Sequence, residues 1–218
     1  MKKIIVSLSG GVDSAVSLAF ALEQGHECHA VSFDYGSKHN YYENNAAVRI
    51  TSHYKIPFRI INLEEVMDGF KSDLLKSGGE IPEGHYEDAS MSKTIVPARN
   101  IIFISILTGL AWSIKAEEIW LGIHAGDHAI YPDCRPEFYY AMKRAIEVGT
   151  DEMVELIAPF LYQGKNDIVK KGIELNVPFE LTRTCYKDQE LACGKCGSCV
   201  ERLEAFSKNR RIDPIDYV

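Results

Sequence analysis

Hydrophobic residues gather in short runs rich in β-branched side chains, and longer segments with helical spacing separate these runs. The runs cover residues 3–8, 29–33, 58–63 and 119–123. Short apolar runs bounded by turn-forming residues are typical of buried strands. Because such strands alternate with helical patterns, the sequence predicts an α/β fold with a parallel sheet.

Two helices can be assigned from the same pattern. Residues 13–24 carry apolar side chains at helical spacing, and Gly25 is a suitable C-terminal stop. Residues 101–112 form the longest apolar stretch, well short of the roughly 20 residues that span a bilayer. This stretch therefore predicts a buried helix and not a membrane span.

Residues 67–94 are polar and rich in Gly, Ser, Glu and Asp, with Gly78, Gly79 and Pro82 among the chain breakers. They predict an exposed loop. A loop of this length is uncommon inside a compact domain, and both a functional loop and a disordered segment fit the pattern.

Composition excludes several classes of protein. The chain has 218 residues and 46% hydrophobic content, enough for a sizeable core. Its net charge of −7 argues against binding along a nucleic-acid backbone. Ser7, Ser9 and Gly10 interrupt the first apolar run too early for the core of a signal peptide. We expect a cytoplasmic protein with no direct nucleic-acid partner and no membrane association.

Residues 9–14 read Ser-Gly-Gly-Val-Asp-Ser and lie between the first strand and the first helix. The glycines let the backbone approach an anion, and the free N–H groups and dipole of the helix favour phosphate there. The alternative is an ordinary turn in which Asp13 or Ser14 only caps the helix. The complete hexapeptide in this place favours phosphate binding, although it lacks the Lys-Ser/Thr ending of the Walker pattern.

The hexapeptide resembles the pyrophosphatase loop of the PP-loop ATPases. This resemblance implies a Rossmann-like sheet, cleavage of ATP between its α and β phosphates, and adenylation of a carboxyl or carbonyl oxygen before a nitrogen or sulfur nucleophile attacks. Asp13 is suited to orient a metal ion, which we expect to be Mg²⁺. The residues expected to bind the nucleotide are Leu8, Ser9, Gly10, Gly11, Asp13, Ser14, Phe33 and Arg99.

Four of the six cysteines crowd together near the end of the chain, namely Cys185, Cys193, Cys196 and Cys199. Four soft ligands suit tetrahedral Zn²⁺ and leave no position for water, so the spacing predicts a structural zinc site. Binding would pin a C-terminal helix over residues 200–208. An iron–sulfur cluster and a redox-active Cys-x-x-Cys pair are the alternatives.

This chemistry divides the chain into residues 1–180, an ATP-binding domain with a substrate pocket, and residues 181–218, a helical zinc-binding segment. Outside the cluster, Cys28 lies in a predicted strand, where a free cysteine behaves as a small hydrophobe.

Residues 96–100, Val-Pro-Ala-Arg-Asn, open the long apolar helix, and Pro97 suits its first turn. Arg99 would then be a cation at the positive end of a helix. That placement favours an anionic ligand for its guanidinium over a purely structural role.

Residues 124–138 follow the fourth strand and are dense in titratable groups. Arg135 is suited to bidentate pairing with a carboxylate. In the alternative interpretation, Asp133 caps a helix that begins at Pro136, and His124 and His128 face solvent. The sequence leaves both interpretations open.

The segments SGGVDS, FDYGSKH, VPARN, YPDCRPEF and CGKCGSC occur in this order along essentially the whole chain. Together they closely resemble the 7-cyano-7-deazaguanine synthase family. The resemblance implies an ATP-dependent C–N ligase that converts 7-carboxy-7-deazaguanine and ammonia to a nitrile through an adenylate and an amide. It also implies two rounds of ATP activation and a homodimer.

Carried onto this sequence, the resemblance assigns Asp13, Arg99, Lys165 and Asp133 to catalysis. Arg99 and Lys165 would stabilise negative charge on the departing pyrophosphate. The residues expected to line the deazaguanine pocket are Asp127, Tyr131, Asp133 and Arg135.

Three points stay open within this resemblance. Lys165 is also compatible with a solvated helix face. Some family members carry an acidic-Thr-Asp stretch where this chain has His124 to His128, which puts an unchanged substrate pocket in doubt. Cys134 is either a nucleophile that forms a thioester or a packed thiol.

Two other functions fit parts of the sequence. A related PP-loop ligase would couple the activated deazaguanine acid to a different amine, for example on a protein. A zinc-binding module that senses nucleotide would bind ATP without releasing pyrophosphate. The fate of the product, in tRNA, DNA or another pathway, lies outside the sequence.

Overall fold

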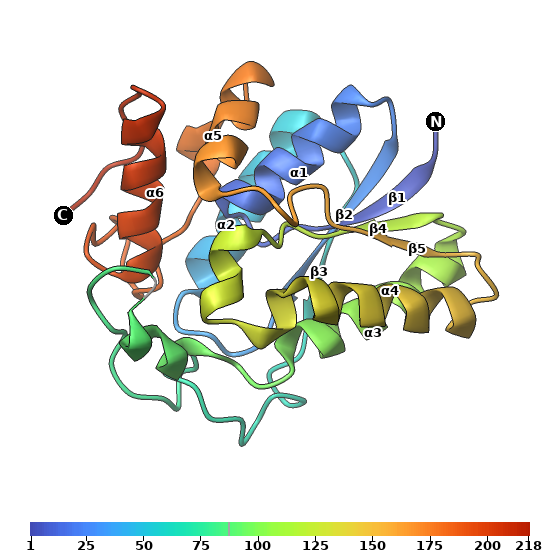
Figure 1. Ribbon diagram of the computed structural model, residues 1–218, viewed down its shortest axis with the longest axis horizontal. Helices are drawn as coiled ribbons and strands as arrows, with labels where there is room; N and C mark the ends of the chain where they lie inside the picture. Colours follow the sequence, from blue (N-terminus) through green and yellow to red (C-terminus); the bar gives the residue numbers. More distant parts are fainter. Residues whose placement is uncertain (87) are drawn as a thin grey trace.

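The computed structural model describes residues 1–86 and 88–218, and one parallel sheet forms its centre (Figure 1). The strand order is β3-β2-β1-β4-β5, which confirms the predicted α/β fold. The strands are β1 (Lys3–Ser7), β2 (Glu27–Asp34), β3 (Phe58–Asn62), β4 (Glu118–Trp120) and β5 (Glu155–Ile157). Strand β5 was not predicted from the sequence, because a three-residue strand with one fully buried side chain leaves too short an apolar run.

Helices cover both faces of the sheet (Figure 1). Alternate side chains of β1 explain the two layers: Ile4 and Val6 pack in one apolar cluster, and Ile5 packs in the other. The first cluster is shared with α1 (Val12–Glu23), α2 (Asn40–Tyr54), α5 (Lys165–Glu174) and α6 (Gly197–Lys208), and the second with α3 (Arg99–Ile114) and α4 (Pro136–Gly149). Cys28 on β2 is buried, as predicted.

From β1 the chain first adds β2 and β3 on one side and then adds β4 and β5 on the other side. The topological switch point therefore lies at the carboxyl ends of β1 and β4. Two glycines let the loops approach there. Gly10 has a φ of +89°, and a Cβ on it would lie 2.5 Å from the Glu43 carbonyl oxygen. A Cβ on Gly122 would lie 3.0 Å from the Ser14 nitrogen. Any larger residue would push the β1 or β4 loop away from this edge.

The prediction of an exposed loop over residues 67–94 is confirmed in part, because no helix or strand forms before η1 in the described residues and about half of them are exposed. Other residues of the segment are anchored in the core. Leu74, Tyr86 and Met91 are buried, and the short 3₁₀ helix η1 (Ala89–Thr94) orders its end. Lys38 Nζ donates to the carbonyl oxygen of Asp73 at 2.7 Å. The polar composition hid these apolar anchors because they are widely spaced.

Helix α3 differs from its prediction in two ways. It begins at Arg99 after Ala98, whose φ is 53°, so Pro97 precedes the helix instead of lying in its first turn. Only one stripe of α3 is buried, and Trp112 is 52% exposed. Within residues 1–86 and 88–218, no helix combines the length and apolar character needed to cross a membrane.

Three further 3₁₀ helices, η2 (Ala125–Ala129), η3 (Pro132–Cys134) and η4 (Phe179–Leu181), follow β4 and α5. The last helix, α6, begins three residues before its predicted start. Arg202 on α6 is fully buried and donates to both oxygens of Asp213 at 2.6 and 2.8 Å. This bidentate pair holds the C-terminal segment that contains Asp213 against α6.

Candidate active site

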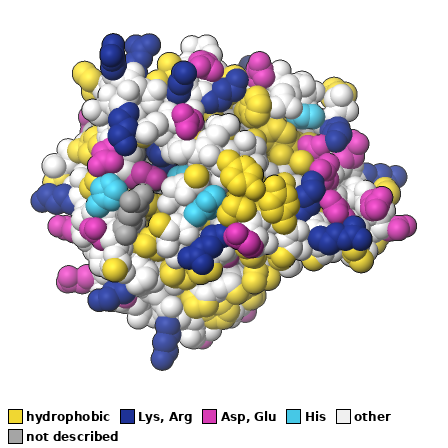
Figure 2. Space-filling view, viewed as in Figure 1, with side chains coloured by type: hydrophobic (Ala, Val, Ile, Leu, Met, Phe, Trp, Pro, Cys, Tyr) yellow, Lys and Arg dark blue, Asp and Glu magenta, His cyan; other side chains and the backbone are white. Residues whose placement is uncertain are grey.

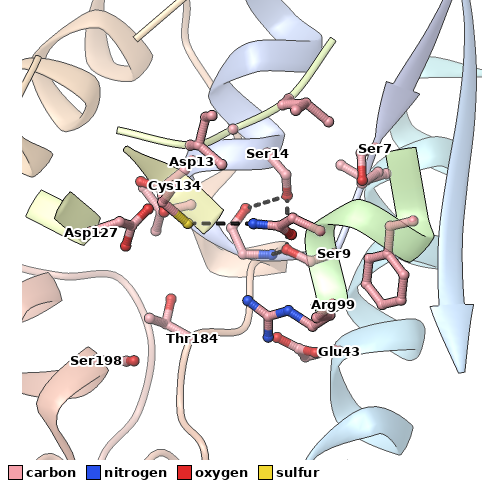
Figure 3. A pocket seen from close by; sticks show the side chains of 18 of the residues that line it. Ser7, Ser9, Asp13, Ser14, Glu43, Arg99, Asp127, Cys134, Thr184 and Ser198 are labelled. Carbon is pink, nitrogen blue, oxygen red and sulfur yellow. Dashed lines mark hydrogen bonds between the residues drawn. The ribbon is translucent and has the colours of Figure 1, made fainter. Parts of the chain in front are cut away.

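A cavity of about 210 Å³ opens at the carboxyl edge of β1, β2 and β4 (Figure 3). Residues 9–14, called the phosphate loop from here on, form one wall, and the loops after β4 and before α3 form another. Polar or titratable side chains line much of it, among them Ser9, Asp13, Ser14, Tyr86, Arg99, Asn100, Asp127, Tyr131, Lys165, Ser198 and Glu201. Leu8, Gly11 and Phe33 also line it. Most of the predicted nucleotide-binding residues therefore meet in one place.

The phosphate loop leaves the start of α1 uncapped by any side chain. Gly11 is the N-cap residue and makes no side-chain cap. Ser14 Oγ donates to the Gly11 carbonyl at 3.1 Å, and the Gly11 N–H donates to Ser9 Oγ at 3.2 Å. The alternative in which Asp13 or Ser14 only caps α1 is therefore wrong, and no side-chain cap competes with an anion at the start of α1.

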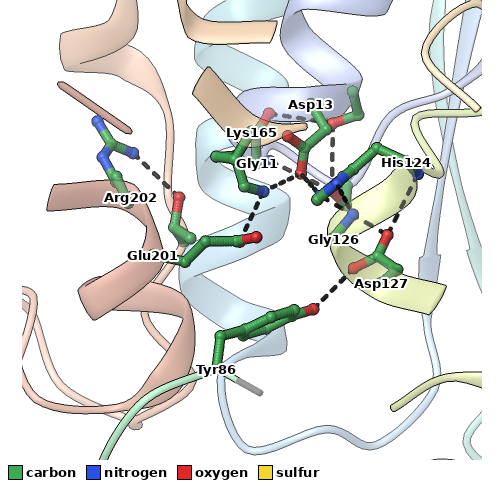
Figure 4. A network of polar contacts seen from close by, with 12 residues as sticks. Gly11, Asp13, Tyr86, His124, Gly126, Asp127, Lys165, Glu201 and Arg202 are labelled. Atoms are coloured by element: carbon green, nitrogen blue, oxygen red, sulfur yellow. Dashed lines mark hydrogen bonds and ion pairs between the residues drawn. The ribbon is translucent and has the colours of Figure 1, made fainter. Parts of the chain in front are cut away.

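Lys165 connects three helices at this edge (Figure 4). Its Nζ lies 2.6 Å from Asp13 Oδ2 and 3.1 Å from Glu201 Oε2. Burial lowers the pKa of Lys165, but the carboxylates of Asp13 and Glu201 outweigh it and the pKa is raised. Lys165 is 8% exposed, so the interpretation as a solvated helix face is wrong.

His124 and Asp127 lie beside this ion pair (Figure 4). The His124 side chain is buried at 1% exposure, and its Nε2 lies 3.7 Å from Asp13 Oδ2 and 3.7 Å from Asp127 Oδ2. Asp127 Oδ1 accepts a 2.8 Å hydrogen bond from the Tyr86 hydroxyl. The interpretation in which His124 faces solvent is therefore wrong.

Arg99 lies on the cavity wall in a position suited to an anion. Its Nη1 donates to the Tyr35 hydroxyl at 3.4 Å. Among the residues described, no carboxylate oxygen lies within salt-bridge distance of its guanidinium. An arginine without a carboxylate partner beside an uncapped helix start strengthens the positive potential of this wall.

Asp133 and Arg135 are not brought to the cavity. Asp133 Oδ2 accepts the N–H of Asn100 at 3.0 Å, so Asp133 stabilises the start of α3 and not, as the alternative had it, the helix at Pro136. Arg135 is exposed, and its Nε donates to the His128 carbonyl at 2.8 Å. The turn through η3 directs both side chains away from the cavity. The prediction that they contact the substrate therefore has no support in this geometry.

Tyr131 does line the cavity, and its hydroxyl lies 2.8 Å from Thr94 Oγ1. Cys134 lies nearby, where Asn100 Nδ2 donates to its sulfur at 3.4 Å. Burial, with Asp127 and Asp133 close by, raises the pKa of the Cys134 thiol well above its usual range. A thiol that resists ionisation is a poor nucleophile, which favours the packed-thiol interpretation.

The four clustered cysteines form a separate buried group. The sulfur atoms of Cys185, Cys193, Cys196 and Cys199 all lie within 4.8 Å of one another. Hydrogen bonds from Cys196 and Cys199 lower the pKa of Cys185, and contact with Cys185 raises the pKa of Cys196 to about 12. Four adjacent thiols cannot all ionise without a cation, so the cluster has the donor set and the spacing of a metal site.

Sequence reasoning missed several cavity residues. Those with the clearest roles in the geometry are Tyr86, Arg183, Thr184, Tyr186, Ser198 and Glu201. Five of them flank or interrupt the cysteine cluster in the sequence, a signal that this segment returns to the sheet edge. Because residues on both sides of position 180 line one cavity, the division into residues 1–180 and 181–218 stays a prediction.

Comparison with known proteins agrees with this arrangement. Residues 3–210 match the family model "Queuosine biosynthesis protein QueC". A protein of Pseudoalteromonas atlantica named 7-cyano-7-deazaguanine synthase is 44% identical over 217 residues, covering 100% of this chain and 99% of its own. One of Caldicellulosiruptor saccharolyticus with the same name is 46% identical, covering 99% and 95%.

Solved structures support the PP-loop ATPase fold. The U34-tRNA thiolase NcsA of Methanococcus maripaludis, with its [4Fe-4S] cluster, gives a TM-score of 0.53 at 16% identity, covering 95% of this chain and 67% of its own. The NMN synthetase of Francisella tularensis gives 0.53 at 14% identity, covering 96% and 77%. At these identities the likeness concerns the fold alone.

The family match spans nearly the whole chain, and the relatives match it from end to end. The chain belongs to the QueC family, the family of the 7-cyano-7-deazaguanine synthases.

Proposed function

We propose that this protein converts 7-carboxy-7-deazaguanine to 7-cyano-7-deazaguanine with ammonia and two molecules of ATP. The first ATP adenylates the carboxylate, and ammonia displaces AMP to give the amide. The second ATP adenylates the amide oxygen, and loss of AMP gives the nitrile. Pyrophosphate leaves in each activation.

One observation carries this proposal. A single cavity joins an uncapped phosphate loop, with Arg99 beside it, to an end walled by Asp127, Tyr86 and Tyr131. An acid bound at that end would lie close to the nucleotide held by the loop, as adenylation requires. The phenol rings of Tyr86 and Tyr131 supply flat apolar surface for a heterocycle, and the Asp127 side chain lines the same end of the cavity.

The chain also offers groups for the cation that accompanies ATP. Asp13 Oδ1 is buried and has no hydrogen-bond partner. Such an orphaned oxygen next to the phosphate loop fits a site for Mg²⁺, which prefers carboxylate and phosphate oxygens. The bound ion would offset the negative charge of the phosphates.

The reaction is tested with purified protein, ATP, magnesium, ammonium and 7-carboxy-7-deazaguanine. Mass spectrometry is expected to show the nitrile, with about two pyrophosphates released per nitrile formed. Amide as the only product, or turnover with another amine alone, would support the related ligase. The absence of pyrophosphate with every substrate would contradict the proposal and leave only nucleotide binding.

We propose that the four-cysteine cluster holds Zn²⁺ in a structural role. All four ligand positions come from the protein, so no position is left for a reacting water. The iron–sulfur alternative uses the same thiolates and differs in its metal content. Gly197 lies between Cys196 and Cys199 and packs against Tyr86, because a Cβ added to Gly197 would lie 3.1 Å from the Tyr86 Cα. The cysteine cluster is therefore packed against a residue that lines the cavity.

Metal analysis tests the zinc assignment. Wild-type protein is expected to hold about one zinc per chain, and Cys196→Ser is expected to lose it, because three thiolates leave the tetrahedral site incomplete. Cys28→Ala is the matched control, since Cys28 is buried on β2 away from the cluster, and it should retain the metal. Iron and sulfide in the purified protein, or full zinc in Cys196→Ser, would contradict the assignment.

We propose that Lys165 and Arg99 stabilise the charge that develops on the leaving pyrophosphate. For Lys165→Met we expect the rate of pyrophosphate release to fall by about 10²- to 10³-fold, the usual effect of removing one preorganised charge. Lys170→Met is the matched control, because Lys170 lies on the same helix and is exposed. Similar rates for the two variants would refute the role of Lys165.

We also propose a cytoplasmic homodimer. A group of hydrophobic side chains is exposed near the centre of one face (Figure 2). Tyr140 and Tyr162 are 53% and 67% exposed, and their hydroxyl oxygens lie 3.2 Å apart. Exposed aromatic side chains of this kind are typical of protein interfaces. Light scattering should give twice the mass of the chain, and a monomer at micromolar concentration would contradict the proposal.

A further inference from the structure

His124 and Asp127 have a geometry that nucleotide binding does not explain. The His124 Nδ1 accepts the N–H of Gly126 at 3.0 Å, which places the proton of the neutral ring on Nε2. That Nε2 is buried and has no hydrogen-bond partner. It points between two carboxylates, with Asp13 Oδ2 and Asp127 Oδ2 each 3.7 Å away.

Among the residues that the structure describes, Asp127 is the carboxylate of this network that has no lysine or arginine within salt-bridge distance. Lys165 pairs with both Asp13 and Glu201. Across residues 1–86 and 88–218, the only ion pair of Asp127 is with His124. The groups facing the pair are Asp13 on α1, Lys165 on α5, Glu201 on α6, and Tyr86 before η1.

Neighbouring groups also fix the direction of the Asp127 carboxylate. Its Oδ1 accepts from the Tyr86 hydroxyl at 2.8 Å, and its Oδ2 accepts from the His124 backbone N–H at 3.4 Å. The side chain lines the cavity, whereas His124 lies behind it. A carboxylate that is held in place, unpaired with a cation and open to the cavity is suited to take a proton from a bound reactant.

We propose that Asp127 is the catalytic base of the nitrogen-transfer steps, and that His124 is the positioning residue that orients its carboxylate. This inference rests on the proposed function, because the protons come from the nitrogen of the amide-forming and nitrile-forming reactions. His124 does not exchange a proton in this scheme. Its Nε2–H carries partial positive charge 3.7 Å from Asp127 Oδ2, which favours this orientation of the carboxylate.

In amide formation, the nitrogen lone pair attacks the acyl carbon of the adenylate. The C–N bond forms, the C–O bond to AMP breaks with its electron pair on AMP, and one N–H proton passes to Asp127. Asp127 then returns its proton to water. Activation of the amide oxygen by the second ATP releases pyrophosphate, and one amide proton passes to solvent. Loss of the last N–H proton to Asp127 then accompanies cleavage of the C–O bond to AMP and formation of the C≡N bond.

The test compares Asp127→Asn and His124→Gln with His53→Gln, whose histidine is exposed on α2. Exchange of labelled pyrophosphate into ATP, with the acid but without ammonium, measures adenylation alone. Ammonium-dependent amide formation measures the nitrogen step. Hydroxylamine is a second nucleophile that is largely unprotonated at neutral pH, whereas ammonia is mostly present as ammonium, so attack by hydroxylamine depends less on a base.

For Asp127→Asn we expect exchange within about 3-fold of wild type and amide formation slowed by about 10²- to 10³-fold, within the usual range for a general base. For His124→Gln we expect a loss of about 10-fold in amide formation, smaller because the carboxylate remains. With hydroxylamine, both variants should recover most of the wild-type rate. His53→Gln should match wild type throughout.

Two results would overturn this inference while the proposed function stands. Equal losses in exchange and in amide formation would show that Asp127 serves binding or folding. Equal losses with ammonium and hydroxylamine would show that no proton transfer depends on it. A wild-type protein that gives no exchange with the acid would instead overturn the proposed function, and with it the inference.

Discussion

The site depends on one buried lysine held between two carboxylates. Lys165 Nζ joins Asp13 at the start of α1 to Glu201 on α6. Each of these groups is costly to bury alone, and removing one partner of such an arrangement leaves an uncompensated charge. The ion pairs therefore fix how three helices meet at the carboxyl edge of the sheet, and they place a cation beside the phosphate loop.

The C-terminal segment supports this arrangement from the other side. Its helix begins within the cysteine cluster, and the fully buried Arg202 anchors it to Asp213. The N–H of Gly84 donates to the Lys195 carbonyl at 3.1 Å, which ties the loop before η1 to the cluster. That loop carries Tyr86, the hydrogen-bond partner of Asp127. The segment that carries the four cysteines and the end of the cavity at Asp127 are thus parts of one structure.

Local patterns in the sequence were enough to predict the parallel sheet, the phosphate loop and the cysteine cluster. Each is encoded by neighbouring residues, such as the apolar run of β1 or the hexapeptide at residues 9–14. The contacts of Glu201 and Tyr86 could not be predicted in this way, because they join residues far apart in the chain.

The region after β4 could also be predicted only in part from local sequence patterns. Its dense titratable groups drew attention to residues 124–138, but the composition did not reveal which side chains enter the cavity. The 3₁₀ turns direct Asp127 and Tyr131 inward and send Asp133 to the start of α3. The choice depends on backbone geometry over a few residues, to which hydrophobic periodicity is insensitive.

The central claim is that both oxygens of the substrate carboxylate leave as oxygens of AMP after two successive adenylations in one cavity. The most direct measurement uses 7-carboxy-7-deazaguanine labelled with ¹⁸O in both carboxyl positions and follows the label by mass spectrometry. The account predicts one ¹⁸O atom in each AMP released during nitrile formation and none in pyrophosphate. Unlabelled AMP, or label released into water or pyrophosphate, would contradict it.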